Sequence, residues 1–457
     1  MQHYLHDYRR RLDDLRRIAG ADNEGTLSPA FAGLLEDYGR EHQLILAREW
    51  AFRGRDGALL RADGVLLDRL RLAHGWWEAK DSKDNLDREI EAKLRKGYPS
   101  DNILFEDTVQ AVLLQNGQEA RRVLLANDAG LAGLLTQFFA FRPPEVEQFE
   151  QAAAQFRRDL PTVLDSLVEL MTQREADNAA FRDRLAEFHG LCVRAIGERV
   201  TPGHVREMLM QHLLTEQIFR DLFPAGAFHQ ENHLARALSG VEQAFLRGET
   251  RHNLLRRMEP YYAAIRRAAA NAVAATEKQE FLKAVYEDFY TAYNPKDADR
   301  MGIVYTPAEV VRFIIQGCDT LARTHFGRGL ADEGLDILDP CTGTGTFIVE
   351  LLEFLRGDRA ALARKYAGEI HANEIAILPY YIAGLNIEQT YADIVGDWRE
   401  FSGACFVDTL ENWGFEKTYS GAQGDLLGSI TDENQQRIRE QNARRIPIII
   451  GNPPYNA

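Results

Sequence analysis

Three short apolar segments in the last third of the chain alternate with helical stretches, and this rhythm restricts the fold more than any other feature. The segments are residues 335–338, 370–373 and 446–450. Strands that alternate with helices form a parallel sheet, and ligands bind such sheets in the loops beyond the carboxyl ends of the strands. We therefore expect an α/β sheet whose site residues follow these three segments.

The last apolar segment runs into Asn452-Pro453-Pro454-Tyr455. An asparagine oxygen can accept a hydrogen bond from an exocyclic amine, and prolines hold the neighbouring carbonyls in fixed positions where they can accept another. Tyr455 offers a face for stacking. This set suits a planar base that carries an amine, although a proline-rich turn after a strand is the alternative for the tetrapeptide alone.

The first apolar segment runs into a loop, residues 339–347, in which Gly343 and Gly345 let the backbone approach a ligand closely. The loop lacks the third glycine of a dinucleotide site and the lysine of a phosphate loop. A ligand with a cationic centre and no phosphate therefore suits Asp339.

Two further acidic residues follow in order along the chain. Glu374, after the second segment, is placed to accept both hydroxyls of a ribose, and Asp408 could accept an adenine amine. Each acid alone is more often a solvated loop residue or a helix cap. Together with Asp339 and the glycine loop, they predict a site for S-adenosylmethionine.

Near the N-terminus, Asp63 is followed after about one hairpin by Glu78-Ala79-Lys80. Alternation along a strand puts Glu78 and Lys80 on one face. Asp63 and Glu78 could then hold Mg²⁺, and Lys80 could orient a water or stabilise charge on a phosphate. A surface pair on a strand is the alternative, because short motifs occur often by chance.

Composition limits the class of protein. The net charge of −15 argues against a chain that coats nucleic acid nonspecifically, and the four dispersed cysteines suit a reducing interior. No signal segment or long apolar span appears, so we expect a cytoplasmic protein without membrane contact. No Gly-x-x-x-x-Gly-Lys-Ser/Thr loop supports an NTP-driven motor.

The order of these motifs resembles that of adenine-N6 DNA methyltransferases, and most closely the type ISP restriction–modification enzymes. The resemblance rests on residues 302–307, 339–347, 373–374, 408 and 452–455, and extends to residues 281–290, 97–105 and the helical segment 214–219. It implies that Thr306 and Phe347 also contact S-adenosylmethionine. It also implies that Asp63, Glu78 and Lys80 form a PD-(D/E)xK nuclease site.

The resemblance implies a multidomain α/β protein. Its expected parts are a restriction-endonuclease-like nuclease domain at residues 1–145, an all-α coupler or spacer at 146–284, and a Rossmann-like methyltransferase sheet at 285–457. This chain departs from the nuclease pattern in having Ala62 before the aspartate, and Asp68 is a rival metal ligand. An upstream helical acid, Glu36 or Glu41, could add a ligand.

The expected function is therefore restriction–modification in phage defence: methylation of adenine N6 in a specific double-stranded DNA site, and Mg²⁺-dependent cleavage of DNA that lacks the mark, without ATP-driven translocation. A truncated, non-catalytic protein that binds DNA or a partner is one alternative, and a protein glutamine methyltransferase is another. Because further strands and target recognition are expected beyond Tyr455, we expect a fragment, or a chain completed by a partner that carries target recognition.

Arginines of the helical middle cluster near two tyrosines. The set comprises Arg251, Arg256, Arg257, Arg266, Arg267, Tyr261 and Tyr262. A groove for the DNA backbone would use such residues. A solvated helix face over an aromatic core stripe is the favoured alternative.

Overall fold

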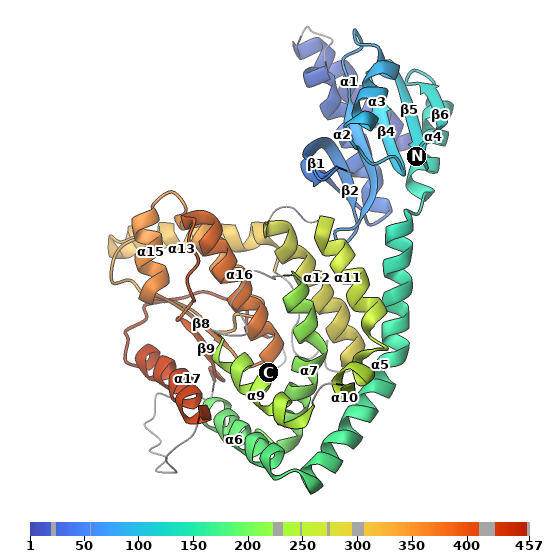
Figure 1. Ribbon diagram of the computed structural model, residues 1–457. Coiled ribbons are helices and arrows are strands. Elements are labelled where there is room, and N and C mark those ends of the chain that lie inside the picture. The colour runs from blue at the N-terminus through green and yellow to red at the C-terminus, as the bar shows by residue number, and fades with distance from the viewer. Residues whose placement is uncertain are drawn as a thin grey trace. The chain divides into compact units, whose positions relative to one another are not determined.

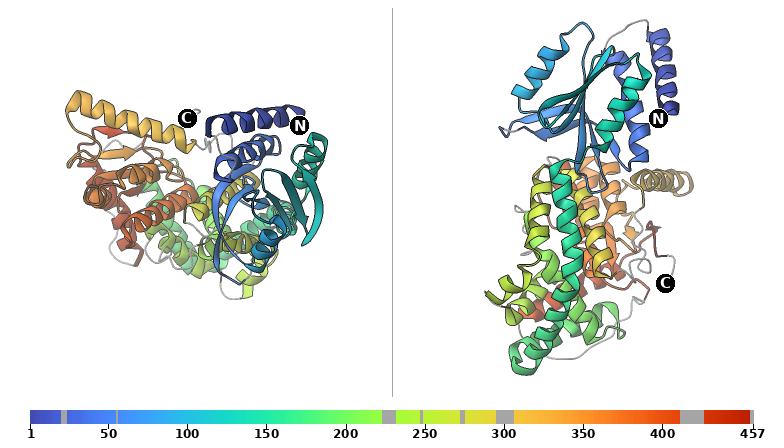
Figure 2. Two further views of the ribbon diagram at one scale, coloured as in Figure 1. Left: turned by 90° about the horizontal axis from the view of Figure 1, so that it is seen from above. Right: turned by 90° about the vertical axis from the view of Figure 1, so that its right-hand side faces the viewer.

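The structure is a computed structural model that describes residues 1–19, 24–54, 56–222, 232–246, 249–271, 275–294, 306–410 and 426–454 (Figure 1). The chain forms two compact units, which are treated separately below. The first comprises residues 1–155 and 263–284, and the second comprises residues 156–262 and 285–457. Figure 2 gives two further views of the same elements. None of the described helices is long and apolar enough to span a bilayer.

A six-stranded mixed sheet, in the order β1-β2-β3-β4-β5-β6, organises the first unit. The strands are β1 (Ile45–Arg53), β2 (Leu59–Leu67), β3 (Ala73–Ala79), β4 (Asn102–Glu106), β5 (Gln110–Gln115) and β6 (Gln118–Leu124). Neighbouring strands are antiparallel except β3 and β4, which run parallel. The carboxyl ends of β3 and β4 therefore lie at the same edge of the sheet.

Helices cover both faces of this sheet. They are α1 (Gln2–Ala19), α2 (Glu24–Glu41), α3 (Leu86–Arg95) and α4 (Asp128–Ala140). Ile103 and Phe105 point to the face on which the buried residues of α3 lie, whereas Leu104 and Trp77 join the core of α1, α2 and α4. Trp77 stacks on Phe31 of α2 with ring centroids 6.2 Å apart. This alternation is the period of two that a sheet buried on both faces requires.

The middle of the chain is helical, as the sequence predicts. The helices are α5 (Pro144–Asp177), α6 (Ala179–Ile196), α7 (Pro202–Leu222), α9 (His233–Phe245), α10 (Glu249–Leu255), α11 (Glu259–Asn271) and α12 (Ala275–Tyr293). Asparagine side chains cap two of them: Asn178 accepts the N–H of Phe181, and Asn232 accepts those of Leu234 and Ala235.

A four-stranded parallel sheet, in the order β10-β7-β8-β9, confirms the α/β prediction for the last part of the chain. The strands are β7 (Ile337–Asp339), β8 (Ile370–Glu374), β9 (Ala404–Phe406) and β10 (Ile448–Ile449). The accompanying helices are α13 (Ala308–Phe326), α14 (Thr346–Leu355), α15 (Arg359–Gly368), α16 (Ile377–Val395) and α17 (Leu426–Asn442). Helices α15, α16 and α17 contact β8 or β9.

Strand β10 is shorter than the apolar segment that predicts it. Pro447 lacks an N–H and cannot donate to the ladder, so pairing with β7 is confined to the residues after it. Ile450 donates to the carbonyl of Leu338 at 2.9 Å. Among the described strands β10 lies at the edge of its sheet, next to the strand that leads into the glycine loop.

Candidate functional sites

The loop from β7 to α14 forms the first candidate site. Gly343 and Gly345 adopt positive φ angles of 57° and 89°, which glycine tolerates and other residues disfavour. A Cβ on Gly345 would lie 3.1 Å from the backbone of Ala383 on α16. Asn386 of the same helix donates to the carbonyl of Thr344 at 2.9 Å. Helix α16 thus fixes the path of the loop from behind.

Three acidic residues converge on this loop, as the sequence predicts. The pKa of the Cys341 thiol is raised to about 11, first by burial and then by the carboxylates of Glu374, Asp339 and Asp408. Glu374 accepts the N–H of Gly343 at 2.8 Å. The ends of β7, β8 and β9 therefore bring their acids to one place.

The carboxyl groups of Asp339 and Glu374 are strongly perturbed. Burial raises the pKa of each to about 7, and Glu374 adds to the rise at Asp339. Asp339 is fully buried, and its Oδ2 has no hydrogen-bond partner among the described residues. Burial of a carboxyl oxygen without a hydrogen-bond partner lowers the stability of the folded protein. These residues therefore fit a ligand that brings positive charge to Asp339.

The Asn-Pro-Pro segment lies directly beside Asp339. A Cβ on Gly451 would lie 2.6 Å from Asp339 Oδ1, so only glycine lets these two segments of the backbone approach each other so closely. Asn452 donates from Nδ2 to Thr306 Oγ1 at 3.0 Å, across 146 positions of sequence. The structure thereby joins the Thr-Pro segment, the glycine loop and the terminal tetrapeptide.

The remaining predicted residues of this site have different surroundings. Pro453 and Pro454 are exposed, and Asp408 caps its own turn by accepting the N–H of Leu410 at 2.9 Å. Phe347 is 4% exposed and belongs to the buried residues of α14. Tyr455 lies outside the described residues.

The second candidate site lies at the carboxyl ends of β3 and β4. Lys80 Nζ lies 2.9 Å from Glu78 Oε2 and 3.8 Å from Asp63 Oδ2, and Asp63 accepts the N–H of Ala79 at 2.8 Å. Glu78 is fully buried, and its Oε1 has no hydrogen-bond partner among the described residues. The three residues predicted for cleavage thus meet, and the orphaned oxygen fits a metal ligand.

Glu24, at the start of α2, is an acid that sequence reasoning missed. Burial raises its pKa, Lys80 opposes this, and Asp63, Glu78 and Asp81 raise it further, so Glu24 faces the second site. The only sequence signal was its place on the helix that precedes the first strand.

The two acids that the sequence offered as an additional metal ligand, Glu36 and Glu41, lie farther along α2. Glu36 is 12 residues after Glu24, about 18 Å along the helix axis. It pairs with Arg40 at 2.6 Å, and Glu41 accepts the hydroxyl of Tyr4 at 2.8 Å. The rival Asp68 accepts the N–H groups of Leu70 and Leu72 in the turn after β2.

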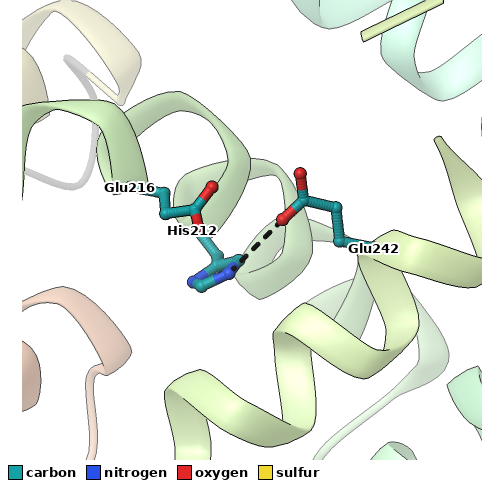
Figure 3. A group of neighbouring side chains, drawn as sticks. All are labelled: His212, Glu216 and Glu242. Carbon is teal, nitrogen blue, oxygen red and sulfur yellow. Dashed lines mark ion pairs between the residues drawn. The ribbon is translucent and has the colours of Figure 1, made fainter. Parts of the chain in front are cut away.

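A buried cluster of His212, Glu216 and Glu242 joins α7 to α9 (Figure 3). His212 Nε2 lies 3.8 Å from Glu242 Oε2. Arg251 donates to Glu216 and to Glu242, each at 2.6 Å. The guanidinium thus supplies the positive charge that these carboxylates need. The cluster is an ion-pair network that ties α7, α9 and α10 together.

The two tyrosines of the helical middle belong to the core. Tyr261 stacks on Phe156 with ring centroids 4.3 Å apart, and the buried Tyr262 donates to the carbonyl of Leu214 at 2.8 Å. Arg251 faces inward. These contacts favour the aromatic core stripe over a DNA groove at these residues.

Comparisons with known proteins match two parts of the chain to families. Residues 153–278 match the type ISP restriction-modification enzyme coupler domain, and residues 277–457 match N-6 DNA methylase. The comparison with curated proteins gives no match.

Solved structures that resemble the chain include three with TM-scores above 0.5. The DrdV–DNA complex is 44% identical, covers 100% of this chain and has a TM-score of 0.62. A nuclease-deletion mutant of the type ISP enzyme LlaGI with a DNA substrate mimic is 29% identical over 72% of this chain, with a TM-score of 0.57. The ATP-dependent type ISP enzyme LlaBIII bound to DNA is 31% identical over 72%, with a TM-score of 0.55. The chain spans only 44%, 26% and 21% of these three chains, respectively.

Proposed function

We propose that this chain, which carries a type ISP coupler domain and an N6 DNA methyltransferase domain, transfers a methyl group from S-adenosylmethionine to adenine N6 in a specific double-stranded DNA site. The observation that carries the proposal is the hydrogen bond from Asn452 to Thr306 beside Asp339. The bond joins the Asn-Pro-Pro segment to the Thr-Pro segment, and Gly451 lies against Asp339 at the start of the glycine loop. DrdV, LlaGI and LlaBIII are each seen with DNA or a DNA mimic, which supports DNA as the substrate.

The residues of the chain act by positioning and electrostatics. S-adenosylmethionine, when bound, supplies a methyl group activated by its sulfonium charge. Asp339, with its orphaned oxygen, would face that charge, and Glu374 would accept ribose hydroxyls. Thr306, Gly343, Gly345, Phe347 and Asp408 would shape the rest of the cofactor site.

On the substrate side, the amide oxygen of Asn452 and the carbonyl of Pro453 would accept the two protons of the adenine amine. This arrangement favours a pyramidal nitrogen whose lone pair can attack the methyl carbon. The adenine must leave the duplex stack to reach them, and Pro454 and Tyr455 would hold it there. The chain forms no covalent intermediate in this scheme.

Methyl transfer from tritiated S-adenosylmethionine to unmodified plasmid tests the proposal. We expect label in the DNA, recovered as N6-methyl-2′-deoxyadenosine after digestion to nucleosides. Label in protein would favour a glutamine methyltransferase instead. Tight DNA binding without any methyl transfer would favour the alternative of a non-catalytic protein that binds DNA or a partner.

The raised pKa values of Asp339 and Glu374 predict how cofactor binding depends on pH. Both groups hold protons more tightly in the folded protein than in the unfolded chain, so the free energy of unfolding falls as pH rises from about 4 to 7. A bound cation favours their charged forms and releases these protons. Affinity for S-adenosylmethionine should therefore rise between pH 6 and 8, by up to about tenfold for each proton released.

Isothermal titration calorimetry measures this dependence, and S-adenosylhomocysteine provides the control. It lacks the sulfonium charge, so its affinity should change less over the same range. Equal pH dependence for the two ligands would contradict the role given to Asp339.

We also propose that Asp63, Glu78 and Lys80 form a Mg²⁺-dependent nuclease site of the PD-(D/E)xK class. The proposed nuclease domain is residues 1–145, followed by a helical coupler at 146–284 and the methyltransferase domain at 285–457. Mg²⁺, when bound, polarises a phosphate and provides hydroxide. Asp63 and Glu78 would hold the ion, with Glu24 as a further acid, and Lys80 would stabilise charge on the phosphate. The orphaned Oε1 of Glu78 supports this assignment.

The two activities together would constitute restriction–modification, with a further segment or a partner supplying target recognition. We place this protein in the cytoplasm, where its DNA substrate lies.

A further inference from the structure

Two ammonium groups share one oxygen of the buried Glu78. Lys80 Nζ lies 2.9 Å from Glu78 Oε2, and Lys93 Nζ lies 2.5 Å from the same atom. The pairing compensates a carboxylate that has no exposed surface. Lys93 was not among the residues that the sequence analysis selected. It is therefore an additional charged residue of the second candidate site.

The structure holds Lys93 in this position through two neighbours. Helix α3 buries Leu86 and Ile90, and Lys93 follows Ile90 by three positions, so it lies on the same face. Its ammonium donates to Tyr98 Oη at 2.9 Å and lies 4.5 Å from the centroid of that ring. Tyr98 in turn donates to the carbonyl of Arg61 on β2. A surface lysine would not be fixed in this way.

We propose that Lys93 is a positioning residue that competes with the catalytic metal for Glu78, an inference that rests on the proposed nuclease site. Without metal, its ammonium holds the carboxylate and neutralises its charge. A divalent ion at Glu78 then meets a fixed positive charge a few ångströms away, which opposes its binding. Lys93 thereby lowers the resting affinity of the site for metal while it keeps Glu78 in place.

Binding of Mn²⁺ to the full chain, measured by calorimetry at constant pH without DNA, tests this competition. Lys93→Met removes the charge and keeps an unbranched side chain that is one atom shorter, so Mn²⁺ should bind about threefold more tightly or better. Lys93→Arg keeps the charge and should bind like the wild type. Lys96→Met, at the exposed C-cap of the same helix, is the matched control and should also be unchanged.

Each other result has a definite meaning. Unchanged or weaker Mn²⁺ binding in Lys93→Met overturns the competition and leaves Lys93 a structural ion pair. If Glu78→Ala binds Mn²⁺ as well as the wild type, or neither the wild type nor Lys93→Met binds it, the nuclease proposal itself fails. Thermal unfolding checks that the variants fold, and Lys93→Gln serves if Lys93→Met does not.

Discussion

Replacement of Asn452 by alanine should reduce methyl transfer about 100-fold or more and leave S-adenosylmethionine affinity within about twofold of the wild type. The amide would accept a proton of the adenine amine as the nitrogen turns pyramidal, an interaction that matters in the transition state. Its hydrogen bond to Thr306 orients the amide for that role. Tritium transfer to DNA and calorimetric titration of the cofactor measure the two quantities.

A second variant separates orientation from chemistry. Thr306→Ala removes the acceptor that holds the amide but leaves the amide itself. Because Thr306 is also assigned to the cofactor site, transfer is compared at saturating S-adenosylmethionine, where we expect a smaller loss than in Asn452→Ala. Normal turnover in Asn452→Ala would remove the role assigned to this residue. A parallel loss of cofactor affinity would instead mean that Asn452 supports the glycine loop.

The sequence predicted three of the four strands described in the second unit's sheet, because β7, β8 and β10 each lie in a local apolar segment, whereas β9 was not among the predicted segments. Apolar segments end in acids or glycines, and parallel pairing then carries Asp339, Glu374 and Asp408 to one edge. Such convergence follows from the rule that ligands bind at the carboxyl ends of parallel strands. No long-range information was needed to predict this group.

Contacts between distant elements explain what the sequence did not reveal. Lys93 reaches Glu78 only because α3 packs on the sheet with one particular rotation, and the first turn of α2 places Glu24 where Lys80 affects its pKa. Their local sequences look like those of ordinary solvated helices. Gly451 likewise gives no sign that a side chain there would meet Asp339. Packing geometry decides these positions, and pattern alone does not encode it.

Replacement of Glu78 or Lys80 by alanine should abolish Mg²⁺-dependent cleavage of unmethylated plasmid, with a loss of about 100-fold or more in each case. Glu78→Ala removes the orphaned oxygen that fits the metal, and Lys80→Ala removes the cation that would stabilise phosphate charge. Gel assays of supercoiled, nicked and linear DNA measure the rates.

The controls for this experiment lie within the same chain. Lys83→Ala changes an exposed lysine just after β3 and should cleave like the wild type. Because the residues proposed for methyl transfer belong to the other unit, both cleavage variants should retain methyl transfer to DNA. Cleavage that persists in Glu78→Ala would place the nuclease chemistry elsewhere, whereas loss of both activities would indicate misfolding. Selective loss of cleavage is therefore the result that supports separate sites for cutting and methylation.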